Sequence, residues 1–213
     1  MLADFSTAVQ TADWRQQTFE LYARVRKLAA EQPAAAHQYW LERRNELFRT
    51  HPASALPKTA KSSLSGLRHA DYDPAYRFEA ALTERGRGET LQQRTGTDGV
   101  VHFECLGSLE FEGLGELSLW RHCGYGGGLF LPFRDASSGK AGGSYGGGRY
   151  LLDTIKGAYL GTVSNQSPLH HRLVVDFNFA YNPSCAYDER WACPLPGPGN
   201  RLEAAVPVGE LLS

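Results

Sequence analysis

The spacing of apolar residues in the first sixty positions is typical of α-helices. A first stripe at intervals of three and four residues spans residues 13–31 and comprises Trp14, Leu21, Tyr22, Val25, Leu28 and Ala29. Thr11 or Asp13 is placed to cap this helix, and Pro33 ends it. A second stripe spans residues 35–50 and comprises His37, Trp40, Leu41, Arg44, Leu47 and Phe48. The two stripes predict a helical hairpin within residues 1–60.

From about Pro74 the period of the pattern falls to two. Short alternating runs cover residues 76–80, 100–105 and 108–111, Asp98-Gly99 is a hairpin signal, and further strands are expected at 128–133, 148–153, 172–181 and 202–208. Seven or more short strands without intervening helices favour a closed or nearly closed antiparallel barrel or sandwich. The predicted fold is therefore α+β, mainly β, with an N-terminal helical hairpin in 1–60 and an antiparallel β-barrel or sandwich in 61–213.

Composition and charge exclude several classes of protein. The chain has 213 residues, of which 42% are apolar and 21% charged, and this is a globular composition. A net charge of -1 argues against a nucleic-acid partner, which would require many phosphate contacts. No apolar run approaches the roughly 20 residues that span a bilayer, and the first residues do not resemble a secretory signal. We therefore expect a soluble cytoplasmic protein with neither nucleic acid nor membrane as partner.

The four cysteines include no C-x-x-C pair, and in the cytoplasm they are expected to be reduced. Cys185 and Cys193 are eight positions apart, a spacing compatible with a disulfide, half of a metal site or two packed thiols. The histidines show no metal-binding spacing, and the glycine-rich stretches lack a phosphate-binding motif. The sequence therefore predicts no metal and no cofactor.

The most informative stretch is the strand predicted at 172–181 and the proline-rich loop that follows it. Alternation would place Asp176 and Asn178 on one face and the apolar residues on the other. The polar face either meets water or lines a barrel interior, where unpaired polar groups would be costly and would mark a site. Arg134 and Arg149 lie in otherwise apolar strands, where they either pair with carboxylates or grip a ligand carboxylate or phosphate.

Several motifs together resemble one known family. They are residues 130–136, 138–139, 145–151, 176–183, 185–187, 193–196, 200–202 and 209–210. From about Trp40 to Glu210 the sequence is similar to bacterial and archaeal proteins grouped as domain of unknown function 1684, a family defined by sequence. The resemblance implies that the polar residues of these motifs belong together.

Three hypotheses for the function follow. The first is a β-barrel that binds a small anionic or polar metabolite through Arg134, Asp135, Tyr145, Arg149, Asp176, Asn178, Tyr181 and Asn182. The second is an enzyme, a hydrolase or a lyase/isomerase, with Asp176 as general base, Tyr181 as proton donor and Cys185 as nucleophile or packing thiol. The third is a structural module in which the polar motif is a satisfied hydrogen-bond network.

Overall fold

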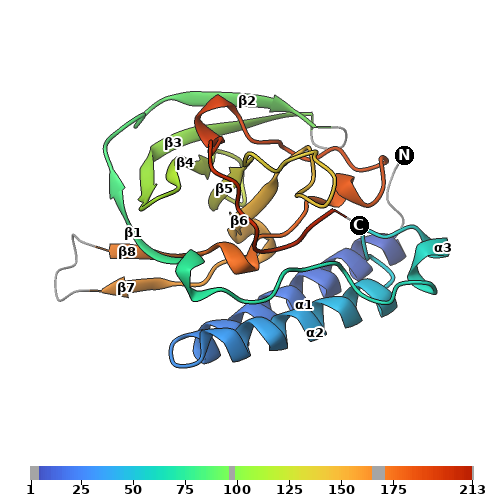
Figure 1. Cartoon of the computed structure of the whole chain (residues 1–213). Helices are drawn as coiled ribbons and strands as arrows, with labels where there is room; N and C mark the ends of the chain where they lie inside the picture. The colour runs from blue at the N-terminus through green and yellow to red at the C-terminus, as the bar shows by residue number, and fades with distance from the viewer. Residues whose placement is uncertain (1–4, 96–98, 165–170, 213) are drawn as a thin grey trace.

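The computed structural model describes residues 5–95, 99–164 and 171–212 and begins with a helical hairpin (Figure 1). Helices α1 (Phe5–Ala29) and α2 (Pro33–Thr50) lie side by side along one side of the sheet, and α3 (Lys58–Lys61) is a single turn. The hairpin was predicted, but α1 begins eight residues earlier than expected. Asp13 is therefore not a cap but lies within the helix, where its Oδ2 is 2.9 Å from His51 Nε2. In the described ranges, no helix combines the length and apolarity that crossing a membrane requires.

Within the described residues, eight strands form one strongly curled antiparallel sheet, a half-barrel (Figure 1). They are β1 (Arg77–Thr83), β2 (Thr90–Arg94), β3 (Val100–Phe111), β4 (Gly115–His122), β5 (Leu129–Phe133), β6 (Arg149–Asp153), β7 (Thr162–Ser164) and β8 (His171–Asp176). Their order is β6-β5-β4-β3-β1-β8-β7, and β2 pairs with β3. This arrangement confirms the predicted mainly-β fold with an N-terminal hairpin.

Two of the strand predictions are wrong: one strand is shorter than predicted, and the other is absent from the described residues. The strand expected at 172–181 ends at Asp176, because the Asp176 carboxylate accepts the backbone N–H of Asn178 at 3.0 Å and starts a 3₁₀ turn over Phe177–Phe179. Residues 202–208 form no strand, because carbonyls of this segment accept hydrogen bonds from Arg149 instead of from a neighbouring strand.

The hairpin predicted at Asp98-Gly99 joins β2 to β3, which pair from Thr90–Glu104 to Arg94–Val100; Asp98 itself lies outside the described residues. The runs at 100–105 and 108–111 merge into the single strand β3, with a bulge between Cys105 and Gly107. Strand β7 was not predicted, and β2 was expected only as the strand before the hairpin at Asp98-Gly99, with no range of its own. β2 reads Thr-Leu-Gln-Gln-Arg, which has one apolar position and gives no clear alternation.

Apolar side chains pack on both faces of β8. Val175 and Leu173 belong to the core inside the curl, whereas Val174 packs with residues of the helical hairpin. The side chain of Asp176 is buried as well. The alternative in which one whole face of this strand meets water is therefore wrong, because the helices cover that face.

Candidate functional site

Arg149, the first residue of β6, has a fully buried side chain. Its Nη2 atom donates to Asp135 Oδ2 at 2.8 Å and to Val206 O at 2.9 Å, and its Nη1 atom donates to the carbonyls of Val208 and Glu210. Burial alone would raise the pKa of Asp135, but the charge of Arg149 and hydrogen bonds to the carboxylate outweigh it and lower the pKa. This guanidinium therefore holds the C-terminal segment against β6.

Arg134 lies on the other face of the β5–β6 pair. Phe133 is the cross-strand partner of Arg149, and the Arg149 guanidinium carbon lies 4.9 Å from the Phe133 ring centroid. Because successive residues alternate, Arg134 faces the opposite way. The buried Nε of Arg134 has no hydrogen-bond partner in the described part of the chain. The structure therefore does not bring the two guanidinium groups together, and the ligand-binding role of each stays a prediction.

Asp176 and Asn178 anchor the turn after β8 to the segment before β1. Asp176 Oδ1 accepts from Asn178 Nδ2 at 2.8 Å, and Asp176 Oδ2 accepts from the Tyr72 hydroxyl at 3.2 Å. The Asn178 amide exchanges two hydrogen bonds of 2.8 Å with the backbone of Asp73. Burial raises the pKa of Asp176, although hydrogen bonds from Asn178 and the charge of Arg77 oppose the shift. Both side chains are thus committed to protein partners.

A second buried ion pair joins α2 to the C-terminal segment. Arg44 Nη2 lies 3.1 Å from Glu210 Oε2, and the Tyr187 hydroxyl accepts from Arg44 at 3.0 Å and donates to Glu210 Oε1. The Asn182 N–H donates to Glu210 Oε2 at 3.0 Å, and His69 Nε2 lies 3.9 Å from the same oxygen. The Arg44 guanidinium carbon also lies 5.4 Å from the Tyr181 ring centroid. We call this group the Arg44 cluster; it consists of Arg44, His69, Tyr181, Asn182, Tyr187 and Glu210.

Several polar atoms in the Arg44 cluster are buried without a hydrogen-bond partner among the described residues. They are Arg44 Nη1, Tyr181 Oη, Asn182 Oδ1 and both ring nitrogens of His69. Burial, followed by the charge of Arg44, lowers the pKa of His69 to about 2, so its ring is neutral. Leaving such an atom unpaired costs about 1–3 kcal/mol. Buried polar groups of this kind are normally satisfied by ordered water or by a ligand.

Cys185 and Cys193 lie next to each other in the loop after β8. Both are free and half-buried, and each is close enough to the other to shift its pKa. The Tyr145 hydroxyl lies 3.9 Å from Cys185 Sγ. The hydrogen bond from Cys185, helped by backbone N–H groups and the charge of Lys156, lowers the pKa of Cys193 to about 6. The same contact, together with burial, raises the pKa of Cys185.

Of the three arrangements that the sequence allowed for these cysteines, the disulfide is not formed in the structure, where both are free thiols. Within the described part of the chain, no three His, Cys, Asp or Glu side chains gather as metal ligands would. The lowered pKa also falls on Cys193 and not on Cys185, which the sequence named as candidate nucleophile. No hydrogen bond or ion pair among the described residues links Cys185 to the other two catalytic candidates, Asp176 and Tyr181.

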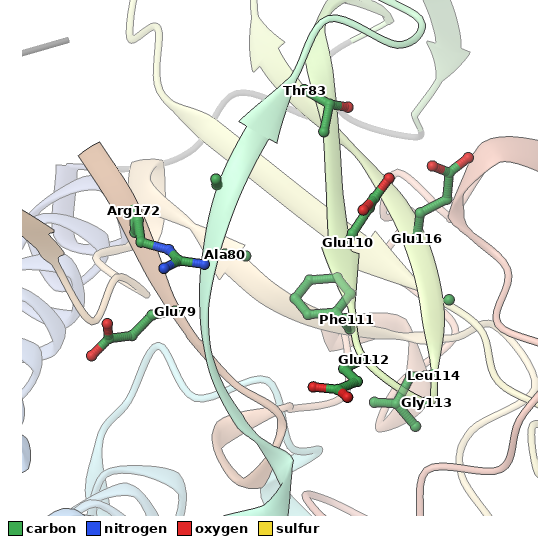
Figure 2. A pocket seen from close by; sticks show the side chains of 12 residues that line it. Glu79, Ala80, Thr83, Glu110, Phe111, Glu112, Gly113, Leu114, Glu116 and Arg172 are labelled. Carbon is green, nitrogen blue, oxygen red and sulfur yellow. The ribbon is translucent and has the colours of Figure 1, made fainter. Parts of the chain in front are cut away.

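A hollow of about 760 Å³ opens where β1 and β3 diverge. Figure 2 shows Glu79 and Arg172 on one side of β1 and Glu110, Phe111 and Glu112 on the other. Within the described residues, β1 and β3 pair only at Leu82–Leu109 and Thr83–Ser108. The lining contains none of the residues that the sequence predicted to bind a ligand. The hollow is a surface recess, separate from the Arg44 cluster.

Comparison with known proteins identifies the family. The profile of a family described as a protein of unknown function, DUF1684, matches residues 62–211. The chain belongs to the DUF1684 family. The solution NMR structure of the uncharacterized protein from gene locus rrnAC0354 of Haloarcula marismortui is similar, with 32% identity, a TM-score of 0.56, and coverage of 81% of this chain and 90% of that chain. No curated protein matches.

Sequence reasoning about this DUF1684 protein found Tyr181 and Asn182 but missed the groups around them. His69 lies in no motif that points to a site, and Glu210, although it lies in the matching motif 209–210, was not named as a binding residue. Arg44 lies in α2, ahead of the segment that matches the family profile. The available signal was a charged residue on the apolar stripe of a helix, because such a residue is buried only with a partner.

Proposed function

We propose that this protein binds a small, uncharged polar molecule at the Arg44 cluster. The observation that carries the proposal is the concentration of buried, unpartnered polar atoms on Arg44, His69, Tyr181 and Asn182. A ligand that hydrogen-bonds to these atoms would remove the penalty of leaving them unpaired.

The charge balance of the cluster favours an uncharged ligand over an anion. Glu210 compensates Arg44 at 3.1 Å, and His69 is neutral. A bound anion would therefore lack a cation of its own and would face the Glu210 carboxylate. Arg149 is likewise compensated, by Asp135.

The available donors and acceptors define the chemistry of the ligand. Arg44 Nη1 and the Tyr181 hydroxyl can donate, Asn182 Oδ1 can accept, and neutral His69 offers one donor and one acceptor. A molecule with several hydroxyl groups, or with an amide, matches this mixed set. We therefore propose a polyol, a sugar or a small amide. In this proposal the ligand does not touch four of the predicted binding residues, which support the site instead: Asp135, Arg149, Asp176 and Asn178. Arg134 and Tyr145 remain candidate ligand contacts in the neighbourhood of Cys185 and Cys193.

We place the protein in the cytoplasm as part of this proposal. Its four cysteines are all free, which is usual in a reducing compartment. The net charge of -1 supports a protein without a nucleic-acid partner.

A thermal-shift screen with polyols, monosaccharides and small amides tests the binding. A ligand that binds only the folded state raises the melting temperature with its concentration. The decisive variant is Tyr181→Phe, which removes a hydroxyl without a partner among the described residues. We expect the unliganded variant to be as stable as the wild type or slightly more stable, and the ligand-induced shift to fall.

The matched control is Tyr150→Phe. The Tyr150 hydroxyl donates to the carbonyl of Pro194 at 2.5 Å, so its loss should lower stability and leave the ligand-induced shift in place. An unchanged shift in Tyr181→Phe would contradict the proposed site. A crystal structure in which ordered water alone satisfies these atoms at high ligand concentration would contradict the function itself.

A further inference from the structure

The hollow between β1 and β3 interrupts an otherwise continuous sheet. Among the described residues, the two strands pair at only two positions, next to the point where they diverge. Both strands continue beyond this point, because β1 stays paired with β8 over residues 77–81 and β3 stays paired with β4 up to Phe111. Along this stretch each strand therefore has a neighbour on one side and an open edge on the side that faces the hollow.

The backbone of Glu79 points into this gap. Glu79 lies opposite Val174 of β8, and the Val174 N–H donates at 3.0 Å to the carbonyl of Gly161, just before β7, on the side of β8 away from β1. Residues that face each other in an antiparallel pair either exchange both hydrogen bonds or exchange none. The N–H and C=O of Glu79 are therefore directed towards β3, where, in the described ranges, the ladder does not reach them. Open backbone groups of this kind are where a further strand can add.

The hollow has an apolar floor and an acidic lining (Figure 2). On the core side, the ring centroids of Phe78 and Phe111 lie 5.4 Å apart and join the two strands. Four glutamates and one arginine line the hollow: Glu79, Glu110, Glu112, Glu116 and Arg172. Glu116 lies 2.7 Å from Arg85, whereas the other three glutamates make no ion pair within the described part of the chain. The hollow therefore carries uncompensated negative charge.

We propose that the hollow binds a basic, extended segment of a partner protein, which adds as an antiparallel strand to the open edge of β1. The backbone of the segment would pair with the free N–H and C=O of Glu79. The side chain directly opposite Glu79 lies on the same face of the sheet, so a Lys or Arg there meets the Glu79 carboxylate, and the next basic residue follows two positions along. The volume of about 760 Å³ is sufficient for a ligand. This binding is independent of the Arg44 cluster.

The charge of the lining favours a basic partner over a second copy of this chain. Two copies paired through this edge would place glutamates next to glutamates, and like charges on facing strands are destabilising. Charged residues on an open edge are a common protection against such self-pairing. A basic segment converts the same carboxylates into attractive partners, whereas an acidic segment would find one cation, Arg172, in the lining that the structure describes.

Fluorescence anisotropy with the full-length protein and a labelled Lys-Val-Lys-Val-Lys peptide tests the proposal. We expect saturable binding that weakens as salt is added, and no binding of Glu-Val-Glu-Val-Glu. In the proposed antiparallel register the lysine N–H groups face β1 and the valine N–H groups face away. Methylation of the lysine backbone nitrogens keeps the charge and should weaken binding at least about tenfold, whereas methylation of the valine nitrogens should weaken it less than about threefold.

Variants of the protein locate the peptide. Glu79→Gln/Glu110→Gln should weaken binding at least about fivefold. The matched control is Glu31→Gln/Glu189→Gln, which makes the same change of charge at exposed glutamates outside the hollow and should change the affinity less than about twofold. Arg172→Gln should strengthen binding about twofold, because it removes a like charge.

Three results would overturn the proposal. The first is that wild-type protein does not bind the lysine peptide at low ionic strength. The second is equal affinity for the lysine-methylated and unmethylated peptides, because the attraction would then be one of charge without strand addition. The third is equal affinity of the two double variants, because the peptide would then bind elsewhere. The peptide series uses wild-type protein and decides the proposal even if a variant does not fold.

Discussion

Replacing Arg149 by methionine tests whether the buried guanidinium holds the C-terminal segment. Met keeps most of the length and apolar volume of the side chain but removes every hydrogen-bond donor. The change leaves Asp135 without its cation at 2.8 Å, and it leaves the carbonyls of Val206, Val208 and Glu210 without this donor. The Asp135 carboxylate would retain the Ser137 N–H at 2.7 Å and the Ser144 hydroxyl at 2.9 Å.

The magnitude follows from the burial of both partners, whose side chains are fully inaccessible. Removing one member of a buried pair costs about 3–5 kcal/mol, because the remaining charge is uncompensated. We therefore expect Arg149→Met to lower the free energy of unfolding by about 4 kcal/mol. With a urea m-value of about 2 kcal/mol/M, the midpoint would fall by about 2 M. This is a large share of the 5–15 kcal/mol typical of a native domain.

Arg134→Met is the matched control, since Arg134 makes no ion pair in the part of the chain that the structure describes. It should cost less than about 1 kcal/mol. The double variant Arg149→Met/Asp135→Asn should recover part of the loss, because a neutral amide no longer needs a cation. The reasoning would be refuted if Arg149→Met and Arg134→Met had equal urea midpoints.

Three further predictions concern stability. The folded state holds His69 neutral with a pKa of about 2, against about 6.5 when unfolded, so below pH 6.5 the unfolded state binds more protons. As the pH falls from about 6.5 towards 2, the free energy of unfolding should therefore decrease by up to about 1.4 kcal/mol per pH unit. His69→Gln should reduce this pH dependence in urea titrations. Gly107→Ala should lower the melting temperature strongly, because the φ of Gly107 is +142° and a Cβ would lie 2.0 Å from Thr83 O. Gly126→Ala is the control and should change the melting temperature little, because a Cβ there meets no atom within 4 Å. Asn200→Ala should lower the free energy of unfolding by about 3 kcal/mol in urea titrations, because its amide bonds the Trp120 indole and two strand carbonyls.

The helices were predictable where one face is buried and unpredictable where none is. The apolar stripe from Trp14 to Ala29 packs on α2 and the sheet, and its period identified that part of α1. The first turns carry Phe5 and Val9, which are 86% and 50% exposed, so burial imposes no amphipathic pattern there. Helix existence was therefore predicted and its N-terminal boundary was not.

The strand predictions failed where side chains, and not a neighbouring strand, are the hydrogen-bond partners of the backbone. Residues 177–181 and 202–208 both alternate in polarity like strands. In the first, the Asp176 carboxylate captures a backbone N–H, and in the second Arg149 captures backbone carbonyls. The period of the apolar residues indicates which face of an element is buried. It does not indicate which side chain will hydrogen-bond to the backbone.

For the candidate site, the sequence supplied the residues of one segment but not their partners. Tyr181 and Asn182 stood out within a dense motif, while the groups that surround them come from α2 and from the last residues of the chain. Arg44 and Glu210 are far apart in sequence, and only the fold brings them to 3.1 Å. The motif therefore identified Tyr181 and Asn182 as site residues. The charged groups that determine which ligand the cluster can bind became apparent only in the tertiary structure.

The change of period near Pro74 separates the helical hairpin from the strands, and contacts between the two parts show that each depends on the other. Trp40 of α2 is completely buried, and its ring centroid lies 5.3 Å from that of Phe179 in the turn after β8. Arg44, one turn later, compensates Glu210 in the C-terminal segment. Without the hairpin, the β segment would expose Val174 and Phe179, and the Glu210 carboxylate would lose its cation. The helical hairpin therefore provides both an apolar cover for β8 and the charge that completes the Arg44 cluster.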